Sequence, residues 1–137
     1  MAKPEGSLTP VQLEIMEVIW ASEPEGATVA DIWRQIHAAR PVARTTILNL
    51  VDRLHRRGWL RRRKADSGYH YSATEDRSRT RAHLAGQFVE SFFEGSASNL
   101  VMSLLGVNGL DVEDIERLRQ ILDESQAPEA PGEGTRP

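Results

Sequence analysis

The chain has 137 residues, of which 39% are hydrophobic, and a formal net charge of -3 at pH 7, values that fit one domain or a small domain with an appendage. The absence of cysteine excludes a disulfide framework, a thiolate nucleophile and a Cys-ligated metal site. No stretch reaches the roughly 18 apolar residues of a membrane-spanning helix, and residues 1–6 carry no apolar signal region. We therefore expect a cytoplasmic protein that does not insert into membranes.

Two helices with capped starts open the chain. Thr9 and Gln12 are placed to form a capping box ahead of apolar residues at helical spacing. Thr28 and Asp31 repeat this arrangement for a second helix. The second helix is expected to end before Pro41, because the residue that precedes a proline is pushed out of helical geometry.

A third helix is predicted over residues 42–57, ending at Gly58 in a left-handed conformation. At about 100° per residue, its apolar stripe and its polar residues fall on opposite faces. The stripe consists of Ile47, Leu50, Val51 and Leu54. The opposite face carries Thr45, Asn49, Asp52 and Arg56.

A short β-hairpin follows the third helix. Residues 59–64 have extended, basic character, residues 65–68 supply turn chemistry, and residues 69–72 alternate with period two. We expect Tyr69 and Tyr71, which share a face, to cover the hydrophobic core. Three helices followed by such a hairpin are the order of a winged helix-turn-helix domain, predicted here over residues 8–74.

The basic residues are concentrated in one segment of an acidic chain. Residues 34–64 hold ten Lys or Arg residues and a single acid, Asp52, which we expect to pair with Arg56 at i+4. Such a local excess of positive charge is typical of a surface that binds a polyanion. A basic run can also be a solvated face, and charges on an edge strand can serve only to block aggregation. The three-helix and hairpin context favours DNA.

The third helix and the hairpin supply the candidate DNA contacts. A major groove admits one helix, whose early residues meet base edges and whose later cations meet phosphates. The early residues able to hydrogen-bond are Arg44, Thr45, Thr46 and Asn49, and the later cations are Arg53, Arg56 and Arg57. The hairpin adds Arg61 and Arg63 on one face and Arg62 and Lys64 on the other.

Residues 75–124 have the pattern of three short amphipathic helices that are marginal as a free-standing core. Their apolar stripes suggest a partner, most economically a second copy of the chain. The candidate dimerisation residues are Leu84, Phe88, Phe92, Leu100, Leu104, Leu118 and Leu122. Residues 1–7 are expected to be flexible, and residues 125–137 have the composition of a disordered tail. The predicted fold is mainly α with a small β-hairpin: a winged helix-turn-helix domain followed by a three-helix dimerisation domain.

The sequence carries no pattern of a catalytic or metal site. The four histidines show no ligand spacing, and no Gly-x-Ser-x-Gly or comparable element places a nucleophile. We therefore expect a protein that is not an enzyme and that uses neither a metal nor another cofactor.

Four stretches of the chain resemble the penicillinase-repressor (BlaI/MecI) family of winged-helix transcriptional regulators. They are LTPVQLEIMEVIWA, TVADIW, TTILNLVDRLHRRGWLRRRK and YHYSAT, and the resemblance extends from about Leu8 to Ile121. It implies a homodimer whose N-terminal domains bind a palindromic operator and whose C-terminal helices form the dimer. The implied DNA contacts are Arg44, Thr45, Thr46, Asn49, Arg53 and the wing from Arg62 to Tyr69.

The resemblance also implies relief of repression by a membrane-bound β-lactam sensor with a protease domain, through cleavage in the second C-terminal helix. The corresponding bond here is Ser103–Leu104, where the best-known members have an Asn-Phe pair.

The sequence thus predicts a sequence-specific DNA-binding transcriptional repressor that acts as a homodimer. Two alternatives stay open. In one, the basic face binds an acidic protein or a membrane surface. In the other, a small molecule bound between the two domains gates a winged-helix regulator of another type.

Overall fold

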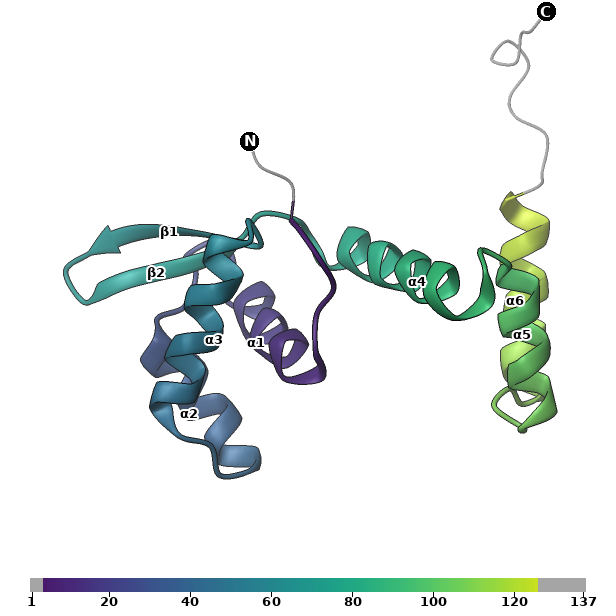
Figure 1. Ribbon diagram of the computed structural model, residues 1–137, viewed down its shortest axis with the longest axis horizontal. Coiled ribbons are helices and arrows are strands. Elements are labelled where there is room, and N and C mark those ends of the chain that lie inside the picture. Colours follow the sequence, from purple (N-terminus) through teal and green to yellow (C-terminus); the bar gives the residue numbers. More distant parts are fainter. Residues whose placement is uncertain (1–3, 126–137) are drawn as a thin grey trace, which may run out of the picture. The chain divides into compact units, whose positions relative to one another are not determined.

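The computed structural model describes residues 4–125, and this part of the chain forms six helices and one two-stranded antiparallel sheet (Figure 1). The first three helices and the hairpin are α1 (Pro10–Ala21), α2 (Val29–Ala39), α3 (Arg44–Arg56), β1 (Leu60–Ala65) and β2 (Gly68–Ala73). Three further helices follow, α4 (Arg77–Phe93), α5 (Ala97–Gly106) and α6 (Val112–Ser125). This order confirms the winged helix-turn-helix fold followed by three helices. Apart from Ser125, the predicted tail lies outside the described residues.

The chain divides into two compact units, an N-terminal unit (residues 1–88) and a C-terminal unit (residues 89–137), with the boundary inside α4. The sequence predicts a boundary between the DNA-binding and dimerisation domains after residue 74. Side chains of α1 hold the start of α4. The Trp20 indole Nε1 donates to the Glu75 carbonyl oxygen at 2.9 Å, and Glu17 accepts from Arg77 at 2.7 Å.

Both predicted capping boxes are confirmed. At the start of α1, the N–H of Gln12 donates to the Thr9 hydroxyl at 3.2 Å, and the N–H of Thr9 donates to the Gln12 side chain at 2.9 Å. Thr28 and Asp31 exchange the same two bonds at the start of α2. The N–H of Thr28 that donates to Asp31 lowers the pKa of this carboxyl below its ordinary value. α2 ends at Ala39, before Pro41, as predicted.

One hydrophobic core lies where α1, α2, α3 and the base of the hairpin meet (Figure 1). The predicted apolar stripe of α3 contributes three fully buried side chains and the half-buried Leu50. The largest fully buried side chains are Trp59, Ile15, Met16, Ile19, Ile32, Ile47, Leu54 and Val51. The direction of α3, and hence of its outer face, is fixed by this core.

A left-handed glycine and a backbone hydrogen bond form the junction between α3 and the hairpin. α3 is shorter than predicted at both ends, and Gly58 has the expected left-handed conformation with φ +84°. The N–H of Trp59 then donates to the Leu54 carbonyl at 2.9 Å. These bonds set where the hairpin leaves the core.

The hairpin pairs Leu60 with Ala73, Arg62 with Tyr71 and Lys64 with Tyr69. The residues before α2 add an isolated bridge, in which Ala27 and Tyr71 exchange backbone hydrogen bonds of 3.0 and 2.8 Å. The hairpin is therefore attached at its base to the start of α2.

Two tyrosines of β2 differ in their surroundings. Tyr71 is 4% exposed and covers the core as predicted, whereas Tyr69 is 43% exposed. The prediction was wrong for Tyr69, because this residue lies two positions nearer the hairpin tip, beyond the edge of the core.

The C-terminal part of the described chain has no buried core. Between residues 81 and 125 no described residue is buried. Ser96 caps α5 by accepting from the Asn99 N–H at 3.2 Å, and Asp111 accepts from the Asp114 N–H at 2.8 Å as α6 begins. None of the described helices combines the length and the apolar character that crossing a membrane requires.

Candidate nucleic-acid interface

The outer face of α3 presents a row of exposed side chains that can hydrogen-bond. Thr45, Thr46, Asn49 and Arg53 are all exposed. Within residues 4–125, their side chains form no hydrogen bond or ion pair. These side chains are therefore available for a ligand outside the chain.

The turn before α3 is held by α2, which fixes the angle between the two helices. The Trp33 indole Nε1 donates to the Val42 carbonyl at 2.8 Å, and the N–H of Val42 donates to His37 Nδ1 at 3.2 Å. Arg44, at the start of α3, has its guanidinium carbon 5.9 Å from the centre of the Trp33 ring. The turn that leads into α3 is therefore fastened to α2 by side-chain hydrogen bonds.

Four of the predicted cationic contacts are engaged within the chain. Arg56 pairs with Asp52 at 3.0 Å, which confirms the pairing expected for this acid. Arg61 donates to the Ala73 carbonyl at 3.1 Å, and Arg63 donates to the Glu25 carbonyl at 3.1 Å. Carbonyl contacts leave the positive charge in place, so Arg61 and Arg63 still add to the local potential.

Arg57 is the most heavily engaged cation of the segment. Its guanidinium donates to the carbonyl oxygens of Glu5 and Ser7, and the Trp59 indole also donates to Glu5, at 3.0 Å. The N–H of Glu5 returns a bond to the Arg57 carbonyl at 3.0 Å. The sequence predicts flexibility for residues 1–7, whereas Glu5 and Ser7 are tied to the end of α3, an interaction that no local sequence signal indicates.

Besides Arg44, the remaining predicted cations are Arg53, Arg62 and Lys64. Arg62 stacks on Tyr69, with its guanidinium carbon 4.3 Å from the ring centre, and both side chains are exposed on the hairpin. Lys64 is paired opposite Tyr69 in the sheet and is also exposed. The predicted basic run therefore separates into cations that bond an acid or a carbonyl of the chain, which are Arg56, Arg57, Arg61 and Arg63, and cations that do not.

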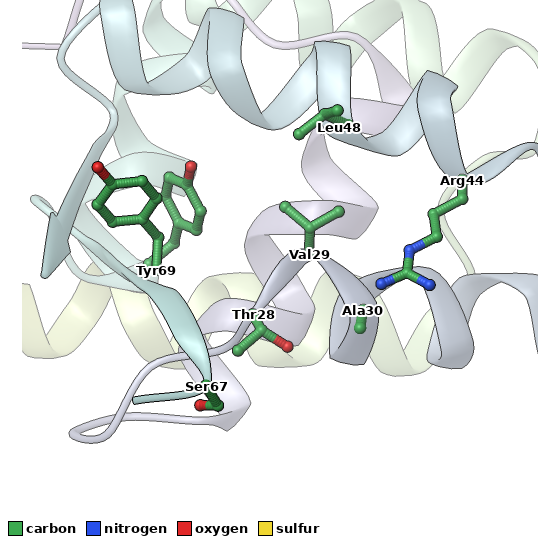
Figure 2. Close-up of a pocket in the computed structure, with 8 residues that line it drawn as sticks. Thr28, Val29, Ala30, Arg44, Leu48, Ser67 and Tyr69 are labelled. Carbon is green, nitrogen blue, oxygen red and sulfur yellow. The ribbon is translucent and has the colours of Figure 1, made fainter. Parts of the chain in front are cut away.

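Leu48 is a surface residue of α3 that sequence reasoning missed. It is 47% exposed and lines a shallow pocket of about 220 Å³ between α2, α3 and β2. Figure 2 shows Leu48 opposite Val29, with Arg44 on one side and Tyr69 on the other. A signal was present in the sequence, because Leu48 is an apolar residue that does not belong to the core stripe of α3.

Nothing in the described part of the chain suggests a metal centre. Residues 4–125 contain no group of three or more His, Asp or Glu side chains that could hold a metal ion.

Comparison with known proteins finds one matching family and several similar proteins. The family model described as penicillinase repressor matches residues 8–124. The methicillin resistance regulatory protein MecI of Mammaliicoccus sciuri is 25% identical over 116 residues, which cover 85% of this chain and 93% of that protein. A penicillinase repressor of Staphylococcus aureus is 25% identical over 124 residues, covering 90% and 97% of the two chains. Among solved structures, that of the S. aureus MepR-DNA complex aligns with a TM-score of 0.45 and 21% identity over 86% of this chain and 76% of that chain.

The match to the family model covers most of the chain, from α1 to α6, and includes the helix and hairpin whose surfaces are described above. It favours a repressor over the two alternatives that the sequence left open. The chain belongs to the penicillinase repressor family and is a DNA-binding transcriptional repressor, not an enzyme.

Proposed function

We propose that this repressor binds a dyad-symmetric operator as a homodimer, with one α3 in the major groove of each half-site. The observation that carries the proposal is the exposed row of Thr45, Thr46 and Asn49, whose side chains have no partner within residues 4–125. Hydroxyl and amide groups at the start of a helix reach base edges when that helix enters the groove. We assign these three residues to base contacts.

We assign phosphate contacts to the cations that bond no acid or carbonyl of residues 4–125. Arg53 lies one turn beyond Asn49 on α3, and Arg62 and Lys64 lie on the hairpin. All three are exposed, and none forms an ion pair with an acid of residues 4–125. Arg44 lies at the start of α3 and completes the set. A phosphate contact positions the protein on DNA and carries no sequence information, so these residues supply affinity and salt dependence.

The C-terminal unit supplies the reason for a dimer. α5 and α6 lie together (Figure 1) and line an apolar groove of about 370 Å³. The residues that line it are Val101, Leu105, Leu110, Ile115, Leu118, Arg119 and Leu122. Met102 and Ile121 are also exposed, at 65% and 54%. Exposed apolar side chains in this number, beside no buried core, are typical of a surface that another chain covers.

A second copy of the chain is the partner that we assign to this surface. A two-fold axis lets the same groove and the same apolar side chains serve both chains. The predicted dimerisation residues Leu118 and Leu122 line the groove, and Leu100 and Leu104 lie half-buried on α5 beside it. Leu84, Phe88 and Phe92 lie on α4, where Phe88 and Phe92 are more than one third exposed, and they remain candidate dimerisation residues.

Relief of repression by a membrane-bound sensor with a protease domain is a further part of the proposal. The candidate bond Ser103–Leu104 lies inside α5, between the groove residues Val101 and Leu105. Leu104 also closes the turn to α6, since its carbonyl accepts from the Gly109 N–H at 2.7 Å. Cleavage there would split the groove and remove the dimer surface. The repressor and its operator would meet in the cytoplasm.

Point variants test the division of labour between base and phosphate contacts. Thr46→Ala and Asn49→Ala should weaken operator binding by about 1 to 3 kcal/mol each and leave binding to random duplexes nearly unchanged. Arg62→Ala should weaken both and reduce the slope of log K against log salt by about one unit. Fluorescence anisotropy at several salt concentrations measures all of these quantities.

The matched control is Gln35→Ala, which removes an exposed amide from α2 and should leave operator binding as it is. Equal losses on operator and random DNA for both classes of variant would contradict the assignment of Thr46 and Asn49 to base reading.

A further inference from the structure

Leu48 is a large apolar side chain that is exposed on α3 and contributes little to the hydrophobic core. Leu48 flanks the core stripe of α3, in which Ile47, Val51 and Leu54 are fully buried, but is itself 47% exposed. Within residues 4–88, the other large hydrophobic side chains with comparable exposure are Tyr69, which stacks under Arg62, and Phe88 on α4. An exposed leucine in the middle of a helix gains little for folding.

The position of Leu48 on α3 places it beside the proposed base-reading residues. Residues three and four apart are neighbours on a helix surface, so Leu48 adjoins Thr45 at i-3 and Asp52 at i+4. It also follows Arg44 by one turn, and Figure 2 shows both side chains along the same side of α3. A base edge that Thr45 reaches therefore lies within reach of Leu48.

The surroundings of Leu48 add an apolar wall. Val29 and Ala30 at the start of α2 and the ring of Tyr69 line the same pocket of about 220 Å³ (Figure 2). An apolar group from a ligand that touched Leu48 would contact these apolar side chains, and the polar Thr28, Arg44 and Ser67 line the rest of the pocket. The pocket is shallow, so it suits a small group at the edge of a larger molecule.

The major groove offers one apolar group at base edges, the C5 methyl of thymine. A leucine has no hydrogen-bonding atom, so it cannot read guanine, adenine or cytosine by donors and acceptors. It can still discriminate, because burying a methyl against it is favourable and placing a polar base edge there is not.

We infer that Leu48 is a specificity-determining residue that packs against the methyl group of a thymine in each operator half-site. The inference rests on the proposed placement of α3 in the major groove and adds a base preference to it. It extends the set of reading residues from hydrogen-bonding side chains to an apolar one.

Deoxyuridine provides the test, because it differs from thymidine only by this methyl group. The full-length protein is first used to select its preferred duplex from random DNA. Binding of that duplex is then compared with binding of the same duplex carrying deoxyuridine in place of every thymidine, at one fixed salt concentration. The comparison is made for the wild-type protein and for Leu48→Ala, after thermal denaturation has shown that both are folded.

The wild-type protein should lose about fourfold in affinity per half-site when the methyl groups are removed, which is the value of one buried methyl. Leu48→Ala should bind the thymidine duplex about as weakly as the wild type binds the deoxyuridine duplex, and should show little further loss. Leu48→Met should keep the preference for thymidine, since methionine offers a similar apolar surface. Val11→Ala, an apolar truncation on α1, is the matched control and should behave as wild type.

Equal losses on deoxyuridine DNA for wild type and Leu48→Ala would overturn the inference, because the methyl would then be read by another residue. Equal affinity of the wild type for the two duplexes would overturn it as well, while leaving the repressor function intact. Failure to select any preferred duplex would overturn both the inference and the proposed function, so the outcomes separate the two claims.

Discussion

The two units of this protein bury their apolar side chains to very different degrees. In the N-terminal unit, Ile15, Ile32, Ile47 and Trp59 are completely buried in one core. In the C-terminal unit, no residue from 89 to 125 is buried, although α5 and α6 carry many apolar side chains. A helix pair of this size cannot enclose a core by itself. The first unit is therefore stabilised from within, whereas we propose that a partner covers the apolar side chains of the second.

The largest effect should come from opening the core of the first unit. Trp59→Ala removes a fully buried side chain that also donates to the Glu5 carbonyl. It should lower the free energy of unfolding by about 3 to 5 kcal/mol, measured by urea denaturation. A loss below about 1 kcal/mol would mean that the core closes without Trp59 and that the contrast between the units is weaker than we describe.

A substitution in the apolar groove of the second unit should weaken dimerisation and leave the folding of the first unit unchanged. Leu118→Glu places a charge in the apolar groove of α5 and α6. It should raise the dimer dissociation constant by at least about tenfold, because a buried leucine contributes about 1.5 to 3 kcal/mol. Sedimentation equilibrium measures the dissociation constant, and hydrogen exchange should show that amides of α1 to α3 keep their protection. Unchanged association would place the partner surface elsewhere.

A smaller effect should distinguish Arg53 from Arg57, which lie one turn apart at the end of α3. Arg57 should affect stability, and Arg53 should affect the salt dependence of DNA binding. Arg57→Ala should lower the free energy of unfolding by about 1 kcal/mol, since its guanidinium bonds two carbonyls of the N-terminal segment, and should leave the salt slope of DNA binding unchanged. Arg53→Ala should do the opposite and lower the slope by about one unit. If both variants lowered the slope equally, Arg57 would contact phosphate as the sequence predicts.

The smallest effect concerns pH. The N–H of Thr28 lowers the pKa of the Asp31 carboxyl below 3.8, so the charged form stabilises the folded state above that pH, and the contribution is lost as pH falls through the lowered pKa. Asp31→Asn should cost about 0.5 kcal/mol at pH 7, the value of a charge at a helix N-terminus. The difference from wild type should shrink between pH 4 and pH 2 in thermal denaturation. A difference that stayed constant over this range would contradict the assigned cause.

Much of the fold could be predicted from local signals. The capping boxes at Thr9 and Thr28, the stop before Pro41 and the left-handed Gly58 depend on residues within one turn of each other, and all four were confirmed. The hairpin was predicted for the same reason. Local rules also gave the i+4 pairing of Asp52 with Arg56.

What the sequence could not give depends on long-range contacts. The attachment of Glu5 and Ser7 to Arg57 spans about fifty residues of sequence. The exposure of Tyr69 depends on where the core ends under the hairpin. The division of the basic run into engaged and available cations is of this kind too, since charge alone does not show which arginine bonds a carbonyl. The contacts with DNA and with a second chain stay predictions.

Hydroxyl-radical footprinting of the selected operator tests the central claim most directly. A homodimer that places one α3 in each half-site should protect two equivalent regions, related by a dyad and centred about 10 base pairs apart. Titration should give two chains per operator. A single asymmetric protected region with one chain bound would contradict the account.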